Sequence, residues 1–258
     1  MLALITLAPL AALFVLSPPI PQDPAYHLFA DRRDFLGIPG FLNVASNLAF
    51  AIVGAAGVLL CAAGRARGAS RAWTFFFAAT ALVAAGSAYY HYAPGNETLV
   101  WDRLPMALAF MALFTAVLAE HVSQRLEMPL LWVTLAIAVG SIVWWRYTDD
   151  LRPYVWVQFG PFLALVFLLA AFPATFTQRK WLAYGAIVYA LAKVFEFGDG
   201  EVLRATGVVS GHTLKHLVAA LAPLCIYVML RWRTPAVHAG GTGTGALASL
   251  AVSRGSER

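Results

Sequence analysis

Long apolar segments separated by short polar ones are the feature that most limits what this chain can fold into. Hydrophobic residues make up 60% of the 258 residues and charged residues only 12%, which is outside the range of a soluble globular domain. A helix of about 20 apolar residues crosses the bilayer hydrocarbon and satisfies its own backbone hydrogen bonds there. The sequence therefore predicts an all-α membrane protein that crosses the bilayer several times.

The segmentation predicts a seven-transmembrane-helix bundle preceded by one extra N-terminal hydrophobic helix. The expected helices span residues 1–16, 41–62, 72–92, 103–121, 130–145, 155–172, 181–197 and 212–230. We expect four regions: an extra N-terminal transmembrane helix (1–17), a polar outer connector (18–40), a seven-helix core (41–231) and a disordered cytoplasmic tail (232–258). The tail is assigned on its Gly-, Ala- and Ser-rich composition.

Basic residues in alternate loops predict the orientation of the chain. These residues are Arg65, Arg67, Arg71, Arg125, Arg179, Lys180, Arg231 and Arg233. The positive-inside rule makes their loops cytoplasmic, and both termini with them. The net charge of +5 is spread over these loops without interleaved aromatic residues, so nucleic-acid binding is not expected and the bilayer is the expected partner. The Ala- and Arg-rich composition indicates the inner (plasma) membrane of a bacterium.

A candidate metal site lies at the outer ends of three expected helices. Both cysteines are in apolar segments, so a metal would have to be held by histidine and carboxylate. His212 and His216 are four residues apart at the start of the last helix and share one face, as in helical zinc sites. The predicted topology brings His91 and Asp102 to the same membrane face. Ionisable groups are costly there without a partner or a function.

Three neutral imidazoles with one open position are the ligand set of a catalytic zinc ion, which activates water for hydrolysis. We therefore predict zinc bound by His91, His212 and His216, with Asp102 as proton acceptor and donor. Ser87, one turn before His91, is the candidate hydrogen-bond donor to an oxyanion; the alternative is a bond to its own helix backbone. The remaining histidines are interpreted as ordinary: His27, His121 and His238.

These residues resemble the alkaline ceramidase family, part of a superfamily of seven-helix membrane hydrolases that also includes adiponectin-type receptors. The resemblance rests on the Phe41 to Asn47 segment, Ser87-x-x-x-His91, Asp102 and His212-x-x-x-His216. It implies that the three histidines bind zinc, that Asp102 handles the proton of water and that Ser87 stabilises the oxyanion. The implied reaction is hydrolysis of a ceramide amide, or of a related N-acyl lipid, to sphingoid base and fatty acid near the outer leaflet.

Two features depart from that family pattern. Gly40 stands where eukaryotic members have a glutamate of a calcium-binding segment, and Arg32 and Arg33 separate Asp31 from Asp34. Calcium binding is therefore doubtful. The extra first helix is also outside the seven-helix pattern.

Alternatives to a ceramidase-like amidohydrolase stay open. An ester-cleaving phospholipase would use the same zinc site, and a receptor or transporter would hold a structural metal. Lys193 and Glu196 are three residues apart and close enough to pair, with Asp199 and Lys215 near the same face. We interpret these charges as an ion-pair network that fixes helix packing; binding of the substrate headgroup is the alternative.

Overall fold

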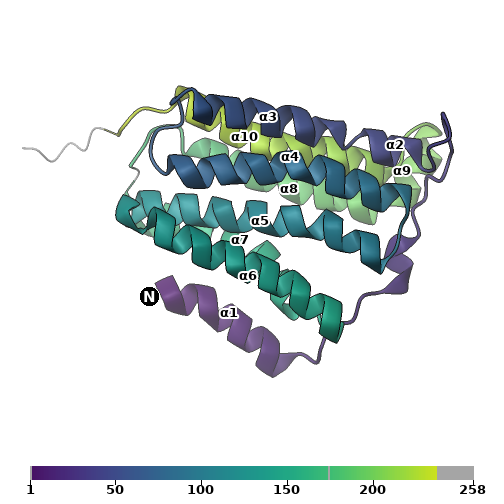
Figure 1. Cartoon of the computed structure of the whole chain (residues 1–258), viewed down its shortest axis with the longest axis horizontal. Helices are drawn as coiled ribbons and strands as arrows, with labels where there is room; N and C mark the ends of the chain where they lie inside the picture. The colour runs from purple at the N-terminus through teal and green to yellow at the C-terminus, as the bar shows by residue number, and fades with distance from the viewer. Residues whose placement is uncertain (1, 174, 237–258) are drawn as a thin grey trace, which may run out of the picture.

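A computed structural model describes residues 2–173 and 175–236 as a bundle of helices that run along one another (Figure 1). The α-helices are α1 (Leu2–Leu16), α2 (Phe41–Ala45), α3 (Leu48–Ala62), α4 (Ser70–Tyr92), α5 (Asn96–His121), α6 (Glu127–Thr148), α7 (Arg152–Ala171), α8 (Lys180–Phe197), α9 (Asp199–Thr206) and α10 (Gly211–Trp232). Short 3₁₀ turns lie at Pro24–His27 and Gln124–Leu126.

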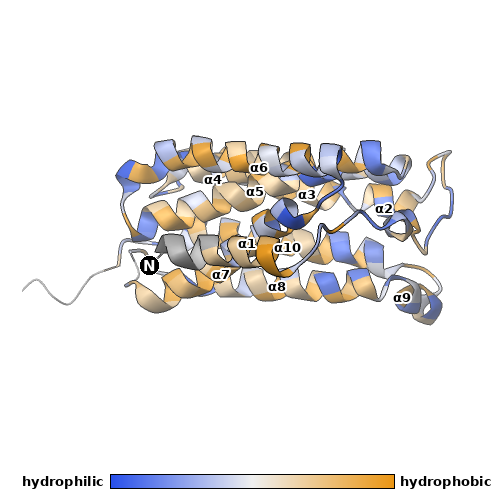
Figure 2. Ribbon diagram, turned by 90° about the horizontal axis from the view of Figure 1, so that it is seen from below, coloured by the Kyte–Doolittle hydropathy of each residue, from blue (hydrophilic) through white to orange (hydrophobic). Residues whose placement is uncertain are grey.

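The long helices have the length and composition of membrane spans. Six stretches of the described chain qualify, and a seventh is added if the bent pair α8 and α9 is one span. Apolar residues predominate along the long helices (Figure 2), and several of them face outward: Leu59, Val166 and Ile187 are 69%, 69% and 64% exposed. Such an apolar exterior fits a lipid environment. The predicted all-helical, multi-span architecture is confirmed at this level.

Helix α1 is the expected extra helix, and it packs along α7. Its 15 residues extend about 22 Å, which is shorter than the roughly 30 Å of bilayer hydrocarbon. The Arg152 guanidinium donates to the carbonyl oxygens of Phe14 and Ser17 at 3.3 and 2.8 Å. These bonds fix the end of α1 against α7, whereas its role as a membrane span stays a prediction.

The expected helix over residues 41–62 is interrupted between α2 and α3. Side chains at the break compete for backbone groups: Ser46 Oγ and Asn47 Nδ2 donate to the Asn43 carbonyl at 3.2 and 2.8 Å. Such local bonds offer the backbone an alternative to the regular helix. The Ser46 side chain at this break contacts His216 of α10, where the candidate site lies.

The C-terminal part of the chain differs from the prediction at two points. Helix α9 was not predicted, and it bends away from α8 by 77° (Figure 1). The predicted tail begins at residue 232, but Trp232 still belongs to α10, and residues 234–236 pair with 175–177 through bonds such as Thr177 N to Thr234 O at 2.9 Å. The tail from residue 237 onward lies outside the described residues.

Candidate metal centre

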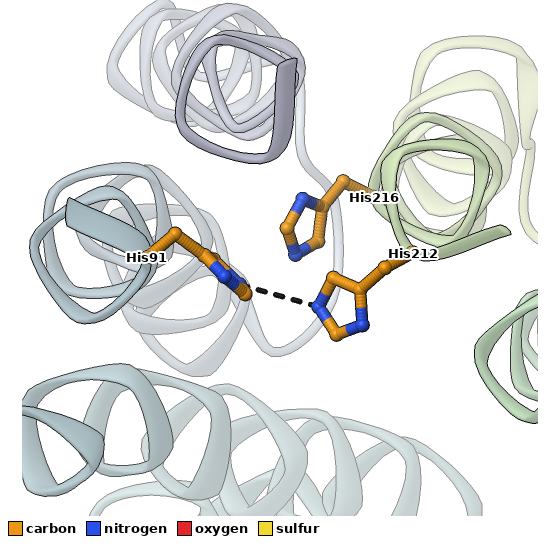
Figure 3. Close-up of side chains that lie close together, drawn as sticks. All are labelled: His91, His212 and His216. Atoms are coloured by element: carbon orange, nitrogen blue, oxygen red, sulfur yellow. Dashed lines mark hydrogen bonds between the residues drawn. The ribbon is translucent and has the colours of Figure 1, made fainter. Parts of the chain in front are cut away.

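Three histidine side chains from two helices converge at one end of the bundle (Figure 3). His91 lies in the last turn of α4, and His212 and His216 lie in the first turns of α10. Nε2 of His91 is 3.2 Å from Nε2 of His212, and the candidate ligand atoms of all three lie within 4.8 Å of one another. All three are buried. The predicted triad is therefore assembled in the structure.

The triad has the features of a metal site. Two nitrogens bound to one tetrahedral zinc ion at 2.0–2.1 Å are about 3.3 Å apart, which agrees with the 3.2 Å between His91 and His212. Nε2 of His216 is buried without a hydrogen-bond partner among the described residues. A buried imidazole nitrogen without a partner calls for a physical explanation, and a coordinated ion provides one. The three residues thus fit a metal ion bound by neutral imidazoles.

Ser46 orients His216 from behind. Its hydroxyl lies 2.9 Å from Nδ1 of His216 and 3.2 Å from the Asn43 carbonyl. When the hydroxyl donates to the carbonyl, it accepts from Nδ1–H, which leaves the lone pair on Nε2 free to face the other histidines. Bonds of this kind fix the ring orientation and tautomer of metal-binding histidines. The Phe41 to Asn47 motif contained this residue, but its spacing alone did not indicate the contact.

The N-terminus of α10 is held by polar side chains from other elements. Ser210 caps the helix by accepting from Thr213 N at 3.1 Å, and Asn43 Oδ1 accepts from Thr213 Oγ1 at 2.7 Å. Asp199 Oδ1 accepts from His212 N at 2.8 Å. Gly211 lies so close to the Phe195 carbonyl and Asp199 that a Cβ atom would not fit. These contacts fix the helix start and, with it, both of its histidines.

The connector before α2 covers the triad. The ring of Phe29 lies 4.5 Å from the ring of His91 and 4.6 Å from that of His212, between centroids. Asp31 in the same connector is buried, and Arg33 donates to both of its oxygens at 2.8 and 2.7 Å. The Arg33 guanidinium holds the pKa of the Asp31 carboxyl below its ordinary value. Arg33 thus forms an ion pair with Asp31, one of the two aspartates that were considered for calcium binding.

A cavity of about 250 Å³ extends from the triad into the bundle. His216, Asp102 and Ser87 line its polar end, and side chains such as Phe110 and Leu165 line the apolar part. Asp102 and Ser87 are both buried. The structure therefore places Asp102 and Ser87 in the same cavity as one histidine of the triad.

Asp102 is deeper in its helix than we predicted. Helix α5 begins at Asn96, directly after the turn at Gly95, so Asp102 lies in its second turn rather than at the start. The Thr98 hydroxyl donates to the carbonyls of Ala93 and Gly95 at 2.6 and 3.0 Å and stabilises this early start. Helix α4 approaches closely because Gly86 lies against the Trp101 carbonyl, where a Cβ atom would not fit. The close packing brings Ser87 to Asp102.

The predicted ion pair of Lys193 and Glu196 is present. Nζ of Lys193 lies 2.6 Å from Oε2 of Glu196, and Nζ of Lys215 lies 3.0 Å from its Oε1. Lys215 also reaches the triad, with Nζ 3.4 Å from Nε2 of His212. All three charged groups line the cavity. Asp199 is not part of this network, because it binds the backbone of Ala30 and His212.

The other histidines lie apart from the triad. His27 contacts the Tyr90 hydroxyl at 2.9 Å and Asn96 Oδ1 at 3.0 Å. His121 contacts the Val117 carbonyl at the far end of α5. His238 lies outside the described residues.

Fold and site together define a multi-span helical membrane protein with a buried three-histidine centre that could hold a metal ion. The family model described as Ceramidase matches residues 37–195, a range that includes Ser87, His91 and Asp102 and ends before α10. The chain belongs to the ceramidase family, which confirms the membership that the sequence motifs predicted. Among the curated proteins, none matches the chain. Membership implies a hydrolase with a lipid substrate.

Proposed function

We propose that the protein is a zinc-dependent intramembrane amidohydrolase that cleaves the amide bond of ceramide, or of a related N-acyl lipid, to sphingoid base and fatty acid. The observation that carries the proposal is the juxtaposition of a buried histidine triad with a largely apolar cavity lined by Asp102, Ser87 and His216. Membership of the ceramidase family supports the same reaction.

The histidine triad and the cavity have separate roles in the proposed reaction. His91, His212 and His216 would hold zinc, with Ser46 orienting His216. Zinc, when bound, supplies Lewis acidity toward a carbonyl and makes water acidic enough to react near neutral pH. The apolar cavity takes the acyl chain and brings the scissile carbonyl to its polar end.

Asp102 and Ser87 act at that polar end. The Asp102 carboxylate is buried and holds the proton that water loses, then returns it to the leaving amine. The Ser87 hydroxyl donates a hydrogen bond to the carbonyl oxygen as negative charge develops on it. Ser87 lines the cavity, which favours this role over a bond to its own helix backbone.

The finer topology is also a proposal. We infer seven spans from residue 41 to the end of α10, an extra helix over 1–17, a connector over 18–40 and a cytoplasmic tail after α10. Both termini lie in the cytoplasm, and the triad lies toward the outer leaflet of a bacterial inner membrane. The alternate basic loops support this orientation.

Release of fatty acid from a fluorescent long-chain ceramide by detergent-purified, zinc-loaded protein tests the function. We expect release by the wild type and none by Asp102→Ala at equal zinc content. Matched amide and ester lipids distinguish the amidohydrolase from a phospholipase, because the amide should be cleaved faster. No cleavage of either lipid by zinc-loaded wild type would contradict the proposal and favour a receptor or transporter with a structural metal.

A further inference from the structure

Arg103 is a buried cation in the lining of the cavity. It follows Asp102 on α5 and is 5% exposed. Its Nη1 has no hydrogen-bond partner, and the guanidinium forms no ion pair with any carboxylate of the described residues. Arginine is always charged and carries five N–H donors, so an unpaired guanidinium inside a membrane protein is costly and marks a site with a function.

Three aromatic rings hold the Arg103 guanidinium in place. Its Cζ lies 4.5 Å from the ring centroid of Trp145, 4.9 Å from that of Tyr154 and 5.4 Å from that of Tyr26. The rings come from α6, α7 and the connector, so three separate elements converge on one cation. Cation–π contacts attract the charge to the rings without neutralising it. The guanidinium is therefore positioned but remains able to bind an anion.

The polar end of the cavity carries more positive than negative charge. Its lining includes the cations Arg103, Lys193 and Lys215 but only two carboxylates, Asp102 and Glu196. Both lysines contact Glu196, at 2.6 and 3.0 Å, and neutralise it. An excess of positive charge in a cavity of low dielectric attracts anionic ligands.

We propose that Arg103 is a specificity residue that binds an anionic group, a carboxylate or a phosphate, in the polar part of the lipid substrate. The inference rests on the proposed function and narrows it, because it favours, among the related N-acyl lipids, those with an anionic polar part over ceramide itself. The planar guanidinium binds either anion through two parallel hydrogen bonds, and the apolar lining takes the acyl chain. A neutral headgroup would leave the Arg103 charge unpaired in the complex.

Calorimetric binding to the metal-free, full-length protein in neutral detergent tests the proposal without relying on catalysis. The carboxylate arm compares N-dodecanoylglycine with N-dodecanoylglycinamide, and the phosphate arm compares ceramide 1-phosphate with ceramide. We expect at least tenfold tighter binding of the anion in one arm, and the arm that shows it identifies the anion. Arg103→Gln should abolish that preference, whereas Arg146→Gln, at an exposed arginine near the end of α6, should leave it unchanged.

Equal affinities for anionic and neutral lipids in both arms would overturn the proposal, as would a preference that survives in folded Arg103→Gln. If thermal unfolding shows that Arg103→Gln does not fold, Arg103→Lys replaces it, because lysine keeps the charge but loses the planar fork. The lysine variant should reduce the preference at least threefold, and an unchanged preference would overturn the proposal. Since binding is read without hydrolysis, an anion preference without fatty acid release would reject only the proposed reaction.

Discussion

The Ser46 hydroxyl lies 2.9 Å from Nδ1 of His216 and joins the break between α2 and α3 to the first turns of α10. Ser46 directly follows α2, and its hydroxyl also contacts the Asn43 carbonyl at 3.2 Å. A polar group behind a metal-binding histidine fixes the ring and its tautomer.

Ser46→Ala should therefore weaken zinc binding while the triad stays complete. Loss of such a partner costs roughly 10–100-fold in metal affinity. Competition with a chromophoric zinc chelator measures the dissociation constant of wild type and variant. Thr74→Ala is the matched control and should leave the affinity unchanged, because this hydroxyl donates to the Ser70 carbonyl near the start of α4, at the end opposite His91.

His216→Ala should remove the metal itself. Two histidines cannot complete the three-ligand set that the site offers, so metal content should fall from near one ion per chain to near zero. Elemental analysis of protein purified without chelator measures the ratio. His121→Ala, at the opposite end of α5, should bind as much metal as the wild type. A wild-type protein purified in this way without metal would contradict the assignment of the triad.

Asp102→Asn should separate catalysis from metal binding. The carboxyl lines the cavity but is not one of the residues whose ligand atoms gather in the triad. Loss of a general acid–base group lowers kcat roughly 10²–10⁴-fold. Metal content should stay at the wild-type level in the same preparation. Wild-type turnover by this variant would assign the proton transfer to another group.

The helices and the triad could be predicted because both depend on local sequence. Apolar runs of sufficient length specify spans, and a spacing of four residues places His212 and His216 on one helix face. His91 required the additional inference from loop charges about which helix ends share a membrane face. The structure brings His91 to the other two histidines, as the order and direction of the helices determine, whereas the orientation in the membrane stays a prediction.

The parts that were missed depend on contacts between elements far apart in the chain. Ser46 lies in an apolar run whose composition favours a continuous helix, and its role needs the Nδ1 atom of His216 across the bundle. The aromatic cage of Arg103 takes one ring from each of three elements. The spacing of residues in the sequence does not predict that these three rings meet at Arg103.

Acid should weaken the attachment of the connector to the loop between α6 and α7. Burial raises the pKa of Asp150, but hydrogen bonds from Arg152, from the Ile20 backbone and from Trp144 outweigh it and lower the pKa to about 2. A depressed carboxyl pKa contributes stability that is present above the unfolded value near 3.9 and is lost as the pH falls through 2. The shift corresponds to about 2 kcal/mol.

Unfolding followed by circular dichroism between pH 7 and pH 2 measures the stability that the Asp150 carboxylate contributes. Asp150→Asn should be less stable than wild type at pH 7 by about 2 kcal/mol, with a difference that disappears near pH 2. Asp34→Asn, at an exposed carboxyl, should match the wild type throughout. A deficit of Asp150→Asn that stays constant down to pH 2 would attribute it to something other than the carboxylate charge.

A buried ion pair holds the bundle together at the end opposite the triad. Arg233, just after α10, donates to both oxygens of Glu120 at 2.8 and 2.6 Å, and the Trp73 indole donates to the same carboxylate at 2.7 Å.

Removing one member of a buried pair leaves an uncompensated charge and costs about 3–5 kcal/mol. Arg233→Met should therefore lower the thermal unfolding temperature by several degrees, while metal content stays unchanged because the triad is at the other end of α10. The double variant Arg233→Met/Glu120→Leu should recover part of the loss, since it removes the stranded carboxylate. A single variant as stable as the wild type would show that the pair contributes nothing to holding α4, α5 and α10 together.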